Sequence, residues 1–237
     1  MSSVDSGNRK EGLTLRKAAL IAGFAYLLSP VTTAEYSIMP KLVIPGNIEQ
    51  TVQNIGAHGG LFVAAIFCYL ITFLEDVVIA WALYYLLAPV SRSASLLTAW
   101  FRLVYTAVVL YGWLNLVTVY RLVKTPEYST SFGTQQLHAQ VNLSLNSFRY
   151  DWSISLVIFG IHLVLLGWLI YRSGYIPRII GILLVIDGLG WVIDSLQPYL
   201  YPNAKLGFIF ITFFGEVVFM LWLLIRGWKI KEPAVQA

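Results

Sequence analysis

The stretch GLFVAAIFCYLITFLEDVVIAWALYYLL, residues 60–87, decides the fold class of this chain. About 20 apolar residues in a helix cross the roughly 30 Å of hydrocarbon in a bilayer, so this segment is long enough to span a membrane. Asp76 stands near its middle, where a charge costs at least roughly 2.5–3.5 kcal/mol on insertion scales. Such a residue usually faces a partner or a wet cavity, so the stretch predicts a membrane helix that borders a polar interior.

The composition of the whole chain supports the same class. Its 237 residues are 58% hydrophobic and 12% charged, with a mean hydropathy of +0.71, whereas a soluble domain is usually about 25% charged. The formal net charge of +4 indicates topology rather than nucleic-acid binding, because the basic residues flank apolar segments. The single cysteine, Cys68, excludes an intramolecular disulfide and a cysteine-built metal cage within one chain.

Six apolar segments predict an all-α fold, a polytopic helical bundle in one membrane domain. The expected spans are residues 17–35, 60–87, 96–120, 152–171, 177–197 and 206–226. Pro30 is expected to kink or end the first helix, since proline removes a backbone donor and clashes with the preceding turn. The predicted organisation is therefore an N-terminal tail (1–16), a six-helix transmembrane domain (17–228) and a C-terminal tail (229–237).

Six spans place both termini on one side of the membrane, and the basic residues indicate which side. The side of the termini holds Arg9, Lys10, Arg16, Lys17, Arg92, Arg172, Arg178, Arg226, Lys229 and Lys231. The opposite side holds only Lys41, Arg121, Lys124, Arg149 and Lys205. By the positive-inside rule, both termini are predicted to be cytoplasmic. Two long connections, 36–59 and 121–151, then lie outside, where ordinary loops are expected, although residues 136–150 could form an interfacial helix.

Ionisable side chains within five different spans predict a polar centre in the bundle: Asp76, Arg102, His162, Asp187 and Glu216. At a rise of 1.5 Å per residue, Arg102 falls nearer the cytoplasmic end and the other four near mid-depth. Glu75 points about 100° away from Asp76 around the helix, so both are not expected in one cavity. A structural alternative stays open, in which Arg102 pairs with Asp76 across antiparallel neighbours and only fixes their register.

Aromatic residues accompany these polar groups on the same helix faces. Asp187, Trp191 and Asp194 follow an i, i+4, i+7 spacing and share one face of the fifth span. On the third span, Arg102, Tyr105 and Trp113 belong to another stripe on one helix face. These mixed faces favour a central pocket, while two plainer roles stay open: an interhelical hydrogen bond for His162 and simple solvation for Asp194.

Asp187 and Glu216 are the strongest candidates for chemistry, because the one basic residue at their depth is His162. A carboxyl group buried without a cation favours its protonated form, and a protonated carboxyl beside an aromatic wall can act as a general acid. We therefore predict Asp187 and Glu216 as an acid–base pair with His162 assisting. The predicted ligand-binding residues are Asp76, Arg102, Tyr105, Trp113, Trp191 and Asp194.

These features favour a membrane enzyme or binder acting on a lipophilic small molecule. Two other classes stay open: a structural or accessory subunit, and a proton- or cation-coupled transporter. The lack of an inverted repeat argues against the transporter. No HExxH, GxSxG or phosphate-loop motif is present. The sequence predicts no metal site and assigns no cofactor. The expected partners are the lipid bilayer and the lipophilic ligand, without nucleic acid.

Several short blocks carry a resemblance to a known family. They include Asp76-Val-Val-Ile-Ala-Trp-Ala-Leu-Tyr84, Trp100-Phe-Arg102, Tyr171-Arg-Ser-Gly-Tyr-Ile-Pro177 and Leu221-Trp222-Leu-Leu. From about residue 15 to residue 228, the chain resembles a bacterial family of six-helix integral membrane proteins catalogued only as a domain of unknown function. The resemblance implies a multi-pass protein of the bacterial inner membrane. The family's recurring polar positions are matched by Asp76, Arg102, His162, Asp194 and Glu216, but no activity or catalytic residue can be carried over.

Overall fold

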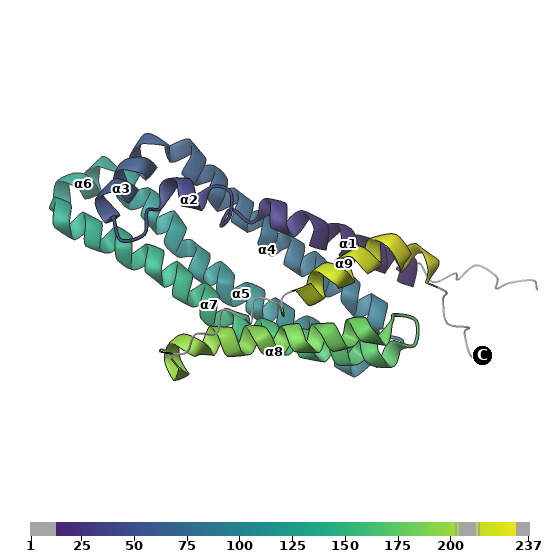
Figure 1. Cartoon of the computed structure of the whole chain (residues 1–237). Helices are drawn as coiled ribbons and strands as arrows, with labels where there is room; N and C mark the ends of the chain where they lie inside the picture. Colours follow the sequence, from purple (N-terminus) through teal and green to yellow (C-terminus); the bar gives the residue numbers. More distant parts are fainter. Residues whose placement is uncertain (1–12, 202, 204–211, 213, 231–237) are drawn as a thin grey trace, which may run out of the picture.

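The structure, a computed structural model, describes residues 13–201, 203, 212 and 214–230, and every regular element within them is a helix. The helices are α1 (Leu15–Thr32), α2 (Met39–Leu42), α3 (Ile48–Ala57), α4 (Gly59–Leu87), α5 (Arg92–Lys124), α6 (Pro126–Ser131), α7 (Thr134–Ser173), α8 (Arg178–Leu200) and α9 (Phe214–Arg226), followed by the short 3-10 helix η2 (Gly227–Lys229). The all-α prediction is thus confirmed for the described part of the chain (Figure 1).

Four helices, α4, α5, α7 and α8, are long and apolar enough to cross a membrane, which makes this a multi-pass membrane protein. They correspond to the second to fifth predicted spans. The first predicted span is the 18-residue helix α1, which ends two residues after Pro30. The sixth predicted span, 206–226, starts outside the described residues and continues in α9. The count of six spans therefore stays a prediction.

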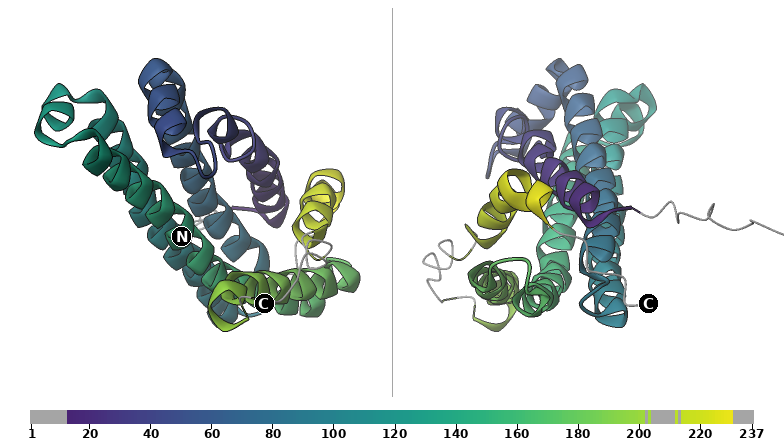
Figure 2. Two further views of the ribbon diagram at one scale, coloured as in Figure 1. Left: turned by 60° about the vertical axis from the view of Figure 1, so that its left-hand side comes forward. Right: turned by 90° about the vertical axis from the view of Figure 1, so that its right-hand side faces the viewer.

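Six helices pack in a closed ring that follows the order of the chain. The contacts run from α4 to α5, from α5 to α7, from α7 to α8 and from α8 to α9. Helix α1 closes the ring by packing on both α9 and α4. Figure 2 shows α1 between α4 and α9. Each helix of a ring turns one face toward the centre. Side chains from helices distant in sequence can therefore meet there.

One end of the bundle gathers the two described ends of the chain and two short turns (Figure 1). Arg16 Nε, at the start of α1, donates a hydrogen bond of 2.8 Å to the carbonyl of Ile230. Tyr175, in the turn after α7, donates from its hydroxyl to the carbonyl of Leu86 near the end of α4, at 2.5 Å. The first and last described helices thus start and finish at the same end.

The opposite end is a helical projection rather than the loops expected there. The connection 36–59 contains α2 and α3, and residues 136–150 belong to α7, one continuous helix of 40 residues. At 1.5 Å per residue α7 is about 60 Å long, about twice the hydrocarbon thickness. A buried stripe explains its continuity, because Leu137, Val141, Leu145 and Phe148 follow helical spacing and α7 packs on α3 and α5 there.

Glycine pairs set the close approach of α7 to α8. A Cβ on Gly160 would lie 2.5 Å from the carbonyl oxygen of Gly188, and one on Gly167 would lie 2.5 Å from that of Gly181. No side chain fits at that distance, so the helix backbones meet directly at both points. Gly174, with φ of 73°, ends α7 in the left-handed region and lets the chain turn into α8.

Candidate ligand-binding site

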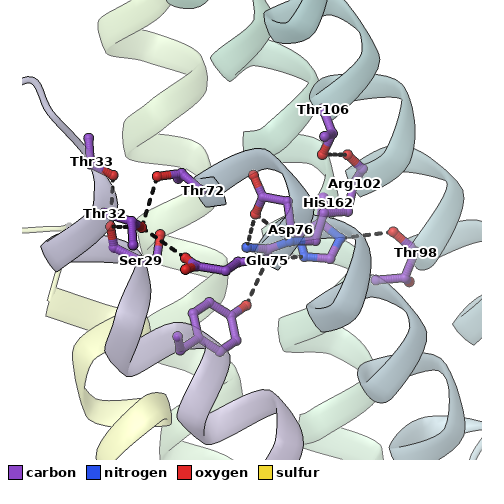
Figure 3. A network of polar contacts seen from close by, with 11 residues as sticks. Ser29, Thr32, Thr33, Thr72, Glu75, Asp76, Thr98, Arg102, Thr106 and His162 are labelled. Atoms are coloured by element: carbon purple, nitrogen blue, oxygen red, sulfur yellow. Dashed lines mark hydrogen bonds and ion pairs between the residues drawn. The ribbon is translucent and has the colours of Figure 1, made fainter. Parts of the chain in front are cut away.

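Arg102 on α5 is the centre of a buried polar network (Figure 3). Its side chain is almost fully buried, and its Nε and Nη2 donate to Asp76 Oδ1 on α4 at 3.0 and 2.6 Å. The pairing left open in the sequence is therefore present. A guanidinium buried in this way must be compensated by charge and by hydrogen bonds, which the following contacts supply.

Two further side chains bind the same guanidinium. Arg102 Nη1 donates to the Tyr26 hydroxyl of α1 at 2.8 Å and lies 3.3 Å from His162 Nε2 of α7. The Nδ1 atom of His162 lies 2.8 Å from the carbonyl oxygen of Thr98. A carbonyl only accepts and a guanidinium only donates, so Nδ1 must carry the proton and Nε2 must accept. His162 is thus a neutral imidazole with both ring nitrogens occupied.

Two aromatic rings lie close to the charged group. The guanidinium carbon of Arg102 lies 5.0 Å from the centroid of the Tyr26 ring and 5.3 Å from that of Phe159. Both distances allow cation–π attraction, which strengthens when the site is desolvated. The network therefore joins α1, α4, α5 and α7 around one buried cation.

Glu75 belongs to a separate, smaller network. Its carboxylate accepts a hydrogen bond of 3.0 Å from Thr32 on α1, whose hydroxyl accepts one of 2.9 Å from Thr72. Figure 3 shows this group beside α1 and apart from the contact between Asp76 and Arg102. The expectation that Glu75 and Asp76 point in different directions is confirmed.

A cavity of about 250 Å³ adjoins the Arg102 network inside the ring. It is bordered by α1, α4, α5, α7 and α9, and its wall combines charged, hydroxyl and apolar side chains. The lining residues are Tyr26, Ser29, Pro30, Thr33, Thr72, Asp76, Arg102, Tyr105, Trp152, Phe159, Glu216, Val217 and Met220. We call this space the central pocket.

Glu216 is the carboxyl group of the central pocket that the protein leaves open. Its side chain makes no hydrogen bond to any described residue, whereas Asp76 already accepts two from Arg102. The backbone N–H of Glu216, in the first described turn of α9, donates to Asp187 Oδ2 at 3.0 Å. Asp187 is fully buried in α8 and lies behind Glu216, outside the lining of the pocket. The predicted acid–base pair is thus adjacent, but only Glu216 faces the cavity.

The remaining predicted ligand-binding residues divide between three places. Tyr105 lines the central pocket, while Trp113 anchors α5 to α4 by donating from Nε1 to the carbonyl of Ile66 at 3.0 Å. Trp191 lines a second cavity of about 240 Å³, which shares Thr33 and Trp152 with the central pocket and reaches Glu35. Asp194 is exposed on α8 and lines neither cavity.

Nine residues of the pocket wall are absent from the predicted set, among them the aromatic residues Tyr26 and Trp152. Tyr26 and Trp152 lie in or near apolar segments, where an aromatic residue indicates packing more often than binding. The hydroxyl of Tyr26 inside a membrane helix was the available signal, because a buried hydroxyl needs a partner. Nothing local in the sequence places that partner on α5.

The buried centre holds more acid than base. Among the described residues, the carboxyl groups of Glu75, Asp76 and Asp187 are buried and that of Glu216 is half-buried, against the one buried guanidinium of Arg102. The neutral His162 adds no charge. Such a centre can accept hydrogen bonds from a ligand or hold a proton, because an excess buried negative charge must be neutralised. No cluster of potential metal ligands is present among the described residues.

Fold and site together define a multi-pass helical membrane protein with a buried ion pair beside an acidic, aromatic pocket. The chain belongs to the family described as Domain of unknown function (DUF4386), whose model matches residues 21–227. An uncharacterized protein of Archaeoglobus fulgidus is 37% identical over 157 residues, which are 66% of this chain and 80% of that protein. No solved structure matches the chain. The bacterial origin and the six helices that the resemblance implies stay predictions.

Proposed function

We propose that this protein binds a lipophilic small molecule in the central pocket, as a six-span protein of a prokaryotic inner (cytoplasmic) membrane with both termini in the cytoplasm. The observation that carries the proposal is the Glu216 carboxyl, which lines a cavity inside the ring of helices and has no hydrogen-bond partner among the described residues. An ionisable group in that position is costly for a membrane protein and is usually functional.

The wall of the pocket indicates the chemistry of the ligand. Trp152, Phe159 and Met220 offer apolar surface, whereas Glu216 offers hydrogen-bond acceptors. The guanidinium of Arg102 is already bound to protein side chains. A matching ligand therefore has an apolar body and a head that donates hydrogen bonds, such as a hydroxyl or a protonated amine. The volume lies just below the range of about 300–1,000 Å³ for ligand pockets, which suits a small ligand or the head of a longer one.

An acid–base step on this ligand would use Glu216 as the proton donor or acceptor. Of the three predicted catalytic residues, Glu216 alone lines the pocket. Asp187 acts through Glu216 by holding its backbone N–H, and His162 acts through Arg102 by accepting from its Nη1. The second cavity shares Thr33 and Trp152 with the pocket and reaches Glu35, so we place the entry of the ligand on this side.

A structural role is the second candidate, and one observation favours it. The contacts of Arg102 with Tyr26, Asp76 and His162 hold four helices together without any ligand. We assign that role to the Arg102 network and the binding role to Glu216, because the network is satisfied within the protein and Glu216 is not. The two roles therefore make separable predictions.

Native mass spectrometry of the protein purified in mild detergent tests the binding role. We expect a bound small molecule of defined mass in the wild type and in Glu127→Gln, a control that removes an exposed carboxyl on α6. Glu216→Leu, which removes both acceptor atoms, should lower its occupancy at least about tenfold. Glu216→Gln keeps a neutral acceptor, so it should retain a ligand with a hydroxyl head and lose one with a cationic head. Equal occupancy in Glu216→Leu and wild type, or no bound molecule in the wild type, would refute the proposal.

A further inference from the structure

A larger cavity lies at the end of the bundle where the described chain starts and finishes, away from the central pocket. Its volume is about 820 Å³, and it is formed by the turn between α7 and α8 together with the end of α9 and η2. The lining residues are Gly174, Tyr175, Ile176, Pro177, Arg178, Trp222, Arg226, Lys229 and Ile230. We call it the basic cavity, because its three charged residues are all cations.

These cations have no acidic partner in the described chain. The one ion pair among the described residues is that of Arg102 with Asp76, neither of which lines this cavity. Arg178 instead lies over the ring of Tyr171, and Lys229 lies over the ring of Trp228. Like charges gathered around one cavity repel each other unless an anion is bound between them. The basic cavity is therefore suited to an anionic ligand.

The surroundings of the basic cavity match the membrane–water interface. It lies where the apolar helix α7 ends and the apolar helix α8 begins, and the neighbouring Trp228 is 54% exposed. Tryptophan rings of this kind collect at the level of the lipid headgroups. Ile179 and Ile225, next in sequence to Arg178 and Arg226, are 58% and 62% exposed, so apolar surface for acyl chains continues beside the cations.

We propose that the basic cavity binds the phosphate of an anionic phospholipid headgroup. Arg178 and Arg226 can each present two parallel N–H donors to phosphate oxygens, and Lys229 adds a third positive charge. The first turn of α8 has no side-chain cap, and the backbone N–H of Ile180 donates to the carbonyl of Pro177, so the backbone N–H of Arg178 in the cavity lining is the one that adds a donor. A lipid explains the exposed isoleucines beside the cations, which a free phosphate ion would leave uncovered.

Lipid titration of the detergent-purified protein tests this site. Native mass spectrometry would compare binding of a phosphatidylglycerol and a phosphatidylcholine with the same acyl chains. The variant Arg178→Gln/Arg226→Gln removes two charges from the cavity. The matched control Lys17→Gln/Arg92→Gln removes two exposed charges at the same end but outside the lining. Because the cavity variant loses the charge-assisted hydrogen bonds of two arginines to the phosphate, which the control keeps, we expect phosphatidylglycerol to bind at least about tenfold more weakly to the cavity variant.

The control should differ from the wild type by less than about twofold, and phosphatidylcholine should bind equally weakly to all three proteins. Equal binding of phosphatidylglycerol to the cavity variant and the control would overturn the site. A competition with inorganic phosphate separates the two possible sources of the anion. Phosphatidylglycerol retained in millimolar phosphate supports a lipid site, whereas its displacement by phosphate would overturn the assignment to a lipid.

Discussion

Arg102 donates to Asp76, Tyr26 and His162, so a single side chain connects four helices. Removing one partner of a buried ion pair leaves the other charge uncompensated, at a cost of about 3–5 kcal/mol. We expect Arg102→Leu to lower the free energy of unfolding by that amount, measured by denaturation in detergent. Arg102→Leu/Asp76→Leu, which removes both charges, should recover most of the loss.

Arg92→Leu is the matched control for the Arg102 variants, because Arg92 is an exposed arginine at the start of the same helix. Its effect should stay within about 0.5 kcal/mol, as for most surface substitutions. An Arg102→Leu variant as stable as Arg92→Leu would show that the buried network contributes nothing to folding.

His162 should occur as the tautomer with its proton on Nδ1. Thr98 offers only a carbonyl oxygen to Nδ1, and Arg102 offers only donors to Nε2. Nitrogen-15 NMR of the histidine rings at neutral pH measures this directly, with the more exposed His58 and His138 as comparisons within the same chain. A proton found on Nε2 of His162 would contradict the hydrogen-bond arrangement.

Some of these side-chain contacts could be predicted from the sequence, and others could not. The pairing of Asp76 with Arg102 was foreseeable as an alternative, because a short turn makes their helices antiparallel neighbours. The opposite direction of Glu75 followed from helical geometry. The contact of Tyr26 with Arg102 was not foreseeable, because it joins residues 76 positions apart and depends on how α1 packs in the bundle.

Between elements, the close contact of α7 with α8 depends on glycine. Alanine normally stabilises a helix by about 1 kcal/mol relative to glycine, but a Cβ on Gly181 would lie 2.6 Å from the carbonyl oxygen of Gly167. We therefore expect Gly181→Ala to lower the melting temperature. Gly60→Ala, at the start of α4 with no neighbouring atom within 4 Å of the new Cβ, should raise it or leave it unchanged. The reverse order would contradict this packing.

The full length of α7 was not predicted from the local polarity of its sequence. Residues 136–150 were expected as a loop or a separate interfacial helix because they are more polar than a membrane span. Their buried stripe has helical spacing, and it continues without a break into the apolar segment that follows. The stripe indicates a helix, but no local pattern shows that α3 packs beside it.

For the whole molecule, the ring of helices places the two described ends of the chain and the basic cavity at the same end of the bundle, and the side of the membrane on which this end lies stays a prediction. Cysteine labelling in a Cys68→Ser background tests the orientation. We expect Gln140→Cys, on the exposed surface of the helical projection, to react with a membrane-impermeant maleimide in spheroplasts. Ser93→Cys, at the opposite end in α5, should react only after the membrane is opened. The opposite labelling pattern would reverse the orientation.

The architecture of the ring was only partly accessible from sequence. Antiparallel packing of consecutive helices follows from short turns, as between α4 and α5 and between α7 and α8. The closure of α1 onto α9 joins residues more than 200 positions apart. The pocket inside the ring depends on that closure, which no local pattern specifies.

A density map of the protein extracted from its native membrane into nanodiscs, determined by cryo-electron microscopy, tests the central claim most directly. The binding role predicts non-protein density in the central pocket, within hydrogen-bond distance of the Glu216 carboxyl and against Trp152 and Phe159. It also predicts that this density is absent from Glu216→Leu prepared in the same way, while the contacts of Arg102 are unchanged. A pocket closed by side chains, with Glu216 paired to a cationic group of the protein, would contradict the claim.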